Sequence, residues 1–377
     1  MSLKIGIVGL PNVGKSTLFN ALVKGSKAEA ANYPFCTIEP NVGIVEVPDE
    51  RLKPLAEISK SEKIIPAVVE FVDIAGLVRG ASKGEGLGNQ FLAHIRECSA
   101  IAMVVRFFED KNVTHIEEKL DPMSDIETIE TELQLADLQT LEKRIASAEK
   151  DIKSGDRLSV IRIQGLKKLK QALDEGKNAR EVELTDEENE HLKDLMLLTQ
   201  KPILYVANCS EEQLVKFKEI LRQAEDPSEA RNNNQTDNGI LITDYNFIPI
   251  SAKVEAELND LPDGDKAEYL ESLGIKESGL HHLIKEAYKA LGLMTYLTSG
   301  EKETRAWTIE RGFTAPQAAG VIHTDFERGF IAADVVNYQD FVANNGWAGA
   351  RAHGLVRTEG KSYLMKDGDI CLFKFNV

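Results

Sequence analysis

The sequence is poor in cysteine and has no long apolar run. Its 377 residues include four cysteines, none in a C-x-x-C pair: Cys36, Cys98, Cys209 and Cys371. Cysteines spread this widely predict neither a zinc module nor a disulfide framework, so we expect reduced thiols. No segment approaches the roughly 18 apolar residues of a membrane-spanning helix, and the chain enters a strand without a signal-peptide pattern. We therefore expect a cytoplasmic protein that does not bind membranes.

Positive charge is also in deficit. The formal net charge is −16, from 61 acidic and 45 basic residues. A field of this sign repels phosphate at long range, which excludes general coating of nucleic acid and binding to an anionic membrane surface. Any contact with nucleic acid must therefore be local.

Short segments rich in Val and Ile alternate with helical stretches along most of the chain. This pattern predicts an α/β fold with a mostly parallel, doubly wound sheet. The expected strands are 5–8, 42–47, 68–72, 101–105, 203–207 and 246–250.

From Ile126 to about Leu198 the apolar spacing becomes helical, which predicts an inserted antiparallel helical hairpin of the coiled-coil type. Its apolar positions are Leu138, Leu141, Ile145, Ala148 and Ile152 in one segment and Leu166, Leu169 and Leu173 in the next. Thr185 and Glu188 form a capping box that predicts a third helix. Residues 157–180 carry seven basic residues against two acidic ones. This segment is either an RNA-docking face or an ordinary solvated helix face.

The pattern changes again after about Leu293. Residues 305–309 alternate as a strand does, and 367–375 read as a final strand, which together indicate a small α+β module with a binding role. We therefore predict three parts: a nucleotide-binding domain (1–125 and 199–293), the helical insert (126–198) and a C-terminal domain (294–377).

Residues 9–16 carry the pattern G-x-x-x-x-G-K-S between a predicted strand and a predicted helix. In such a loop, backbone N–H groups and the positive end of the helix surround a phosphate. Lys15 supplies charge and Ser16 supplies a ligand for Mg²⁺. The predicted phosphate-binding residues are Asn12, Val13, Gly14, Lys15, Ser16 and Thr17.

A second carboxylate follows the strand 68–72, in the sequence Asp73-Ile-Ala-Gly76. An aspartate at a strand end holds Mg²⁺ through water, and the Gly76 N–H is placed to sense the γ-phosphate. Thr37 is a further candidate ligand for Mg²⁺, or a threonine that caps its own turn. Four glycines between 80 and 88 favour a mobile switch.

These three motifs resemble those of the Obg-type GTPases. With the helical insert and a C-terminal module that resembles a TGS (β-grasp) domain, the chain is similar over nearly its full length to the YchF/OLA1 subfamily. The resemblance implies a P-loop nucleoside triphosphatase whose substrate is ATP and whose cofactor is Mg²⁺.

Most relatives in the wider class carry Asn-Lys-x-Asp to read guanine, whereas this chain has Asn208-Cys209-Ser-Glu211. A glutamate displaces the guanine-reading carboxylate by a methylene, and the lysine that packs over the base is absent, so guanine specificity should be lost. The resemblance implies a preference for ATP, with Asn208 as a partner for the adenine amino group. Ser251-Ala252-Lys253 matches the last base-binding loop of the family.

Leu77 occupies the place where many GTPases have the glutamine that orients the attacking water. Hydrolysis must then use another group, and we expect it to be slow. His115 is the preferred candidate and His94 the other, although each is as readily an exposed or capping histidine. Asn12 resembles the loop asparagine of K⁺-stimulated relatives, which suggests K⁺ as an activator.

The resemblance implies the ribosome, through its large subunit or its RNA, as partner of a monomeric clamp built from the insert and the C-terminal module. Three functions remain open at this point. The first is an ATPase switch that cleaves ATP to ADP and phosphate. The others are a nucleotide-dependent binding module with negligible turnover and a GTPase with relaxed base specificity.

Overall fold

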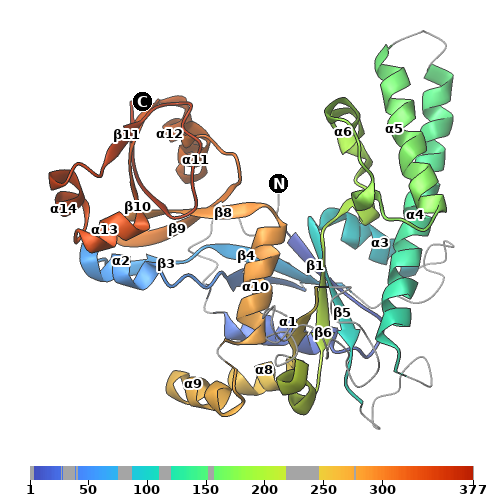
Figure 1. The fold of residues 1–377 in the computed structure, drawn as a ribbon, viewed down its shortest axis with the longest axis horizontal. Coiled ribbons are helices and arrows are strands. Elements are labelled where there is room, and N and C mark those ends of the chain that lie inside the picture. Colours follow the sequence, from blue (N-terminus) through green and yellow to red (C-terminus); the bar gives the residue numbers. More distant parts are fainter. Residues whose placement is uncertain are drawn as a thin grey trace, which may run out of the picture. The chain divides into compact units, whose positions relative to one another are not determined.

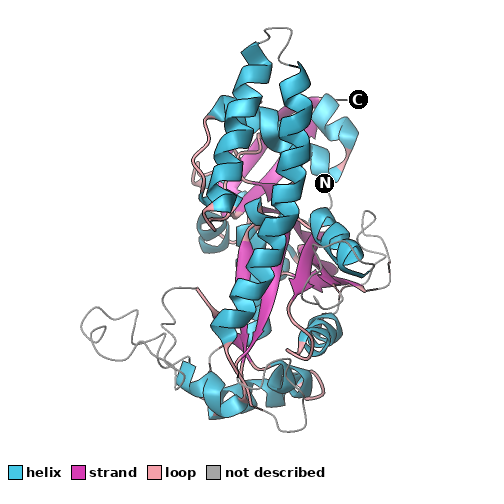
Figure 2. Ribbon diagram, turned by 90° about the vertical axis from the view of Figure 1, so that its right-hand side faces the viewer, coloured by secondary structure: helices cyan, strands magenta, loops and turns pink. Residues whose placement is uncertain are grey.

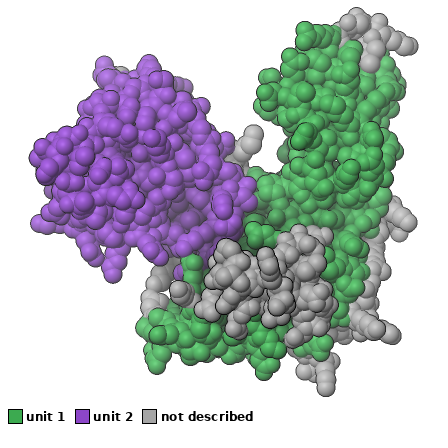
Figure 3. All heavy atoms as spheres, viewed as in Figure 1, with its two compact units in different colours: residues 1–25, 40–43, 71–280 green, residues 26–39, 44–70, 281–377 purple. Residues whose placement is uncertain are grey.

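A computed structural model of the chain describes residues 4–26, 28, 39, 41–74, 87–109, 120–151, 157–217, 246–275 and 277–376. These residues form two compact units, drawn in different colours in Figure 3. The first comprises residues 1–25, 40–43 and 71–280, and the second comprises 26–39, 44–70 and 281–377. Each unit is described by itself.

One six-stranded sheet has the order β2-β4-β1-β5-β6-β7, and its strands β4, β1, β5 and β6 are labelled in Figure 1. Its strands are β1 (Lys4–Val8), β2 (Val42–Glu46), β4 (Val68–Asp73), β5 (Ala100–Arg106), β6 (Ile203–Asn208) and β7 (Ile248–Ile250). Strands β1, β5, β6 and β7 belong to the first unit, whereas the division between the units falls within β2 and β4. The pairs β1·β5, β5·β6 and β6·β7 are parallel. All six predicted strands are therefore confirmed.

Helices connect these strands, as the α/β pattern predicted. They are α1 (Lys15–Gly25), α3 (Leu87–Glu97), α8 (Ala252–Leu258), α9 (Asp263–Ser272) and the start of α10 (Gly279–Ala290). Residues 211–217 are also helical. The carboxyl ends of β1, β5, β6 and β7 lie at one edge of the sheet, which is where doubly wound folds bind their ligands.

The helical insert consists mainly of α4 (Pro122–Asp151) and α5 (Arg157–Asp174), which lie side by side in Figures 1 and 2. They are followed by α6 (Asp186–Leu192) and by short 3-10 turns at 179–181, 193–195 and 198–200. The predicted apolar positions of both helices pack in one cluster: Leu138, Leu141, Ile145, Ala148, Leu166, Leu169 and Leu173. The hairpin is confirmed, and its first helix begins at Pro122, before the predicted start at Ile126.

The predicted capping box at the third helix is also present. The Thr185 Oγ1 accepts a hydrogen bond from the Glu188 backbone N–H at 3.2 Å. In return, the Thr185 N–H donates to Glu188 Oε2 at 2.9 Å. Two N–H groups at the start of α6 are satisfied in this way.

The basic residues of segment 157–180 are all paired with carboxylates. The pairs are Arg157–Glu187, Arg162–Asp194, Lys167–Glu149, Lys168–Glu188, Lys170–Asp174, Lys177–Glu175 and Arg180–Glu130. Most of these pairs are exposed and contribute little to stability. They nevertheless neutralise the excess of positive charge that segment 157–180 shows when it is counted alone, so this segment is not an uncompensated basic surface.

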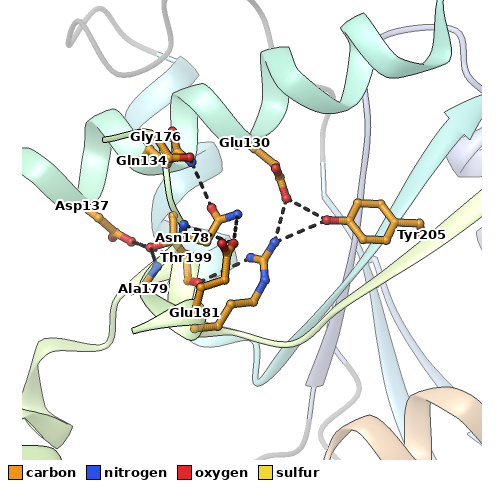
Figure 4. Close-up of polar contacts among 10 residues, drawn as sticks. Glu130, Gln134, Asp137, Gly176, Asn178, Ala179, Glu181, Thr199 and Tyr205 are labelled. Atoms are coloured by element: carbon orange, nitrogen blue, oxygen red, sulfur yellow. Dashed lines mark hydrogen bonds and ion pairs between the residues drawn. The ribbon is translucent and has the colours of Figure 1, made fainter. Parts of the chain in front are cut away.

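Polar contacts fix the base of the insert to strand β6 (Figure 4). The Arg180 Nη2 lies 2.7 Å from Glu130 Oε1, and the Tyr205 hydroxyl donates to the same carboxylate oxygen at 2.7 Å. Close by, the fully buried Asp137 accepts hydrogen bonds from the Leu198 and Thr199 N–H groups and from the Thr199 hydroxyl. The helical insert is thus joined to a strand that ends at a predicted site residue, Asn208.

A second six-stranded sheet, with the order β11-β10-β12-β8-β9-β3, forms the second unit. Its strands are β3 (Lys63–Ile65), β8 (Leu293–Ser299), β9 (Glu303–Glu310), β10 (Phe330–Asn337), β11 (Arg357–Glu359) and β12 (Asp369–Phe375). Its helices are α2 (Leu52–Ser59), α11 (Ala315–Ile322), α12 (Thr324–Arg328), α13 (Tyr338–Ala343) and α14 (Trp347–Ala352), with most of α10. Both strands predicted in the C-terminal module are confirmed.

Strand β3 was not predicted. It pairs in parallel with β9, with Ile64 opposite Thr304. A short segment from the N-terminal part of the chain thus completes the sheet that is otherwise formed by C-terminal residues. A cluster of hydroxyls supports this pairing, with Ser61 Oγ 2.8 Å from Thr304 Oγ1 and Ser59 Oγ 2.8 Å from Ser299 Oγ.

The helices of the described ranges include none with the length and apolarity that crossing a membrane requires.

Replacing Asp137 by alanine should destabilise the first unit by at least about 2 kcal/mol, because two N–H groups and a hydroxyl would lose their buried acceptor. Glu142→Ala, at an exposed position of the same helix, is the matched control and should change stability by less than about 0.5 kcal/mol. Thermal unfolding and hydrogen exchange at Leu198 and Thr199 provide the measurement. Equal effects of the two substitutions would contradict the role given to Asp137.

Candidate functional site: a phosphate loop beside a predicted base-binding loop

The G-x-x-x-x-G-K-S residues form a loop between β1 and α1, as predicted. Asn12 and Gly14 adopt left-handed backbone conformations, with φ of 63° and 97°. A Cβ atom at Gly9 would lie 2.5 Å from the Val104 carbonyl oxygen. These glycines are therefore required by close approach and by backbone conformation. Such a loop ends in a helix N-terminus that favours an anion.

Lys15 is the first residue of α1 and is only 8% exposed. Its Nζ donates to the Leu10 carbonyl oxygen at 2.6 Å, within the same loop. Burial lowers the pKa of Lys15 to about 8, against a smaller opposing effect of Asp73. A partly desolvated ammonium group of this kind gains strongly from a phosphate anion.

Ser16 and Asp73 come together from α1 and from the end of β4. The Ser16 Oγ donates a hydrogen bond to Asp73 Oδ2 at 2.9 Å. The Asp73 N–H donates to the Asn41 carbonyl oxygen at 2.9 Å, which fixes the strand end that carries this carboxylate. A hydroxyl and a carboxylate at this separation are hard oxygen donors that fit Mg²⁺.

Asn208 joins three segments of the first unit. Its Nδ2 donates to the Val13 carbonyl oxygen at 2.9 Å, and its Oδ1 accepts from the Ala252 N–H at 3.1 Å. The side chain is 5% exposed. Both ends of the amide are engaged by the protein, which fixes the side chain between the phosphate loop and the start of α8. The contact with the adenine amino group stays a prediction, since the amide nitrogen carries a second N–H and the oxygen a second lone pair.

The residues around Asn208 are held by the backbone. Cys209 is buried, its N–H donates to the Ile250 carbonyl oxygen at 2.8 Å, and burial raises the pKa of its thiol to about 12. Glu211 is exposed at the start of helix 211–217. Ser251 is buried as the residue before α8, and the Lys253 side chain is exposed. The base-reading residues predicted from the sequence are thus brought to one edge of the sheet.

Several predicted residues lie outside the described ranges: Thr37, Gly76, Leu77 and His115. Their roles stay predictions. His94 lies within α3 and is exposed.

Gln213 was missed in the sequence. Its Oε1 accepts from the Ser210 N–H at 3.0 Å, and its Nε2 donates to the Phe107 carbonyl oxygen at 2.9 Å. The signal that could have found it is the spacing Ser210-x-x-Gln213 directly after a strand, which is a capping-box pattern.

Gly14→Ala should weaken nucleotide binding by more than about thirtyfold, or about 2 kcal/mol. An alanine Cβ would overlap the Asn208 Nδ2, and the residue would have to keep a left-handed conformation. The matched control is Gly176→Ala, which has the same left-handed strain with no atom within 4 Å of the added Cβ. Fluorescent-nucleotide titration of both variants measures the difference, and similar affinities would contradict the close approach to Asn208.

Nucleotide binding at pH 8.5 should take up about three quarters of a proton, because phosphate raises the lowered pKa of Lys15, which is about 8 in the free protein. The terminal phosphate, with a pKa of about 6, is already ionised there. The affinity should fall as the pH rises through about 8, since the ammonium form then has to be made before it can bind. Calorimetry in two buffers of different protonation enthalpy measures the uptake. At pH 6.5 Lys15 is already protonated in the free protein and should contribute no proton uptake. An equal proton uptake at pH 6.5 and pH 8.5 would contradict the lowered pKa of Lys15.

Comparison with known proteins agrees with this geometry. The family MMR_HSR1, described as 50S ribosome-binding GTPase, matches residues 4–136, and YchF-GTPase_C, described as a protein of unknown function (DUF933), matches 293–376. The proteins named Ribosome-binding ATPase YchF from Bacillus subtilis (strain 168) and Haemophilus influenzae are 53% and 49% identical over 377 residues, with full coverage of both chains.

The solved structure of a protein named YchF GTPase, from Schizosaccharomyces pombe, matches with a TM-score of 0.82 and 37% identity. The match covers 99% of this chain and 98% of that one. Because the similarity extends over the phosphate loop, the helical insert and the C-terminal sheet together, the chain belongs to the YchF family of P-loop nucleoside triphosphatases.

Proposed function

We propose that the protein is an ATP-preferring hydrolase, which cleaves ATP to ADP and phosphate and uses the nucleotide state to control binding to the ribosome. The observation that carries the hydrolase assignment is the 2.9 Å contact between Ser16 and Asp73 beside the buried Lys15. It brings together, at one helix N-terminus, the charge and the oxygen ligands that phosphoryl transfer requires. The names of the bacterial relatives support ATP as the substrate and the ribosome as the partner.

The chemistry of the phosphates is assigned to the phosphate loop and to the residues that hold Mg²⁺. Lys15 neutralises charge on the phosphate oxygens, and residues 12–17 surround them with N–H groups. Ser16 and Asp73, with Thr37 as a third ligand, hold Mg²⁺, which spreads the negative charge that develops on the phosphates. Gly76 senses the terminal phosphate.

Water activation is assigned to His115, with K⁺ near Asn12 as an accessory charge, because Leu77 has no group that orients water. A leucine at this place favours a slow intrinsic rate that a partner accelerates. The same proposal includes the division into a nucleotide-binding domain (1–125 and 199–293), the helical insert (126–198) and the C-terminal domain (294–377). In it, the nucleotide-binding domain is the switch, and the insert and the C-terminal domain are attached to it.

The ribosomal contact is assigned to the large subunit or its RNA, and the protein to the cytoplasm, as a monomer. Because the basic residues of segment 157–180 are already paired, we do not assign the contact to charge on this segment. A helical arm fixed to β6 through Glu130, Arg180 and Tyr205 supports a role for its shape instead.

The decisive experiment is titration of nucleotide-free protein with fluorescent ATP and GTP in Mg²⁺ and K⁺ buffer, followed by phosphate release with and without ribosomes. We expect at least tenfold tighter binding of ATP, about 1.4 kcal/mol, and turnover that ribosomes stimulate. GTP is the rival substrate, because the Schizosaccharomyces pombe relative is named a GTPase.

Equal or tighter binding of GTP would overturn the ATPase assignment. Ribosome binding that depends on nucleotide without any stimulated turnover would favour a regulatory binding module over an enzyme. Equal turnover in Na⁺ and K⁺ would remove K⁺ from the mechanism.

A further inference from the structure

The helix that begins at residue 211 is capped by the side chain of Gln213. The Ser210 N–H donates to Gln213 Oε1 at 3.0 Å, and the Gln213 N–H donates to Ser210 Oγ at 3.3 Å. These two bonds form a reciprocal cap at the helix start. Ser210 and Glu211, the last two residues of the base-reading loop (residues 208–211), are thereby given a fixed backbone.

Gln213 also has a contact that a cap does not require. Its Nε2 donates to the Phe107 carbonyl oxygen at 2.9 Å, directly beyond the end of β5. One amide thus links the end of the base-reading loop to a neighbouring strand. Since its oxygen and its nitrogen serve different partners, the two contacts are separable by mutation.

Phe107 is itself well fixed. Its N–H donates to the Asn208 carbonyl oxygen at 2.9 Å, at the other end of the base-reading loop. Its ring makes an edge contact with Phe217, at 5.6 Å and 74°, and another with Phe247, at 5.3 Å and 78°. The base-reading loop is therefore attached to Phe107 at Asn208 directly and at Ser210 through Gln213.

We propose that Gln213 is a positioning residue that sets how much of the nucleotide affinity comes from the base. The inference rests on the proposed assignment of residues 208–211 to the base. Gln213 holds the start of helix 211–217 against the end of β5, which fixes where Glu211 lies relative to Asn208. The hydrogen bonds of Gln213 go to Ser210 and Phe107 rather than to the phosphate loop. The phosphate loop is joined to the Asn208 side chain through Val13, a contact that substitution of Gln213 leaves in place, so its affinity for phosphate should not change.

The expected loss of ATP affinity follows from the loss of one hydrogen bond, which the half-buried Gln213 donates to the Phe107 carbonyl oxygen. Losing such a bond reduces affinity by about threefold to tenfold when the position of the ligand depends on it. The effect should fall on ATP and should be absent for inorganic tripolyphosphate, which carries the same phosphate groups without a base.

The experiment measures the affinities of the full-length, nucleotide-free protein for Mg·ATP and Mg·tripolyphosphate by competition with a fluorescent nucleotide. Gln213→Ala removes both contacts. Gln213→Glu keeps the acceptor for the Ser210 N–H and removes the donor to Phe107, so the helix cap and the fold are retained. Val215→Ala, on the exposed side of the same helix, is the matched control.

Both Gln213 variants should bind ATP about threefold to tenfold more weakly, with unchanged affinity for tripolyphosphate and with Val215→Ala like the wild type. An equal loss for both ligands would mean a general structural role and would overturn the proposal. Wild-type affinity of Gln213→Glu for ATP would overturn it too, since the bond to Phe107 would then carry no function.

The proposed function is tested separately by the wild-type ratio of ATP to GTP affinity. If the wild type prefers GTP, the ATPase assignment fails, while the comparison of nucleotide with tripolyphosphate still measures what Gln213 does for the base. If the wild type gains no affinity from any base, both proposals fail together.

Discussion

The buried amide of Asn208 is the contact on which the rest of the nucleotide site depends. It joins the phosphate loop at Val13, the strand β6 and the first turn of α8 at Ala252. Because a buried amide is costly unless both its ends are paired, these segments are held in register before any ligand arrives. A preformed loop loses less conformational entropy on binding. The same amide explains why residue 14 must lack a side chain.

The electrostatics of the molecule are local rather than global. The chain is strongly acidic, yet its phosphate loop presents a desolvated lysine and the N-terminus of α1. Short-range donors inside a loop act on a bound phosphate without being cancelled by distant surface carboxylates, since salt screens the latter beyond about 8 Å to 10 Å. Segment 157–180 of the helical insert follows the same principle, because its basic residues are paired with carboxylates of the insert.

Much of the fold could be predicted because the spacing of apolar residues along the chain indicates strands and helices directly. The six strands of the first sheet, the apolar seam of the hairpin and the Thr185 cap all follow from residues close together in the sequence. Strand β3 could not be predicted, because Lys63-Ile-Ile65 is short and its partner β9 lies about 240 residues further on. The phosphate loop was predictable from spacing alone. The contacts of Asn208 with Val13 and Ala252 were not, because spacing does not reveal which carbonyl or N–H group an amide faces.

The pairing of β3 with β9 has a consequence for dissecting the protein. Strand β3 forms one end of the C-terminal sheet, and without it the N–H and C=O groups of β9 would form an unprotected edge. A fragment cut at Leu293, where the C-terminal sequence family begins, would therefore tend to add strands from other molecules and aggregate. Supplying residues 44–70 as a separate peptide should restore its solubility, since that peptide carries the missing strand and α2.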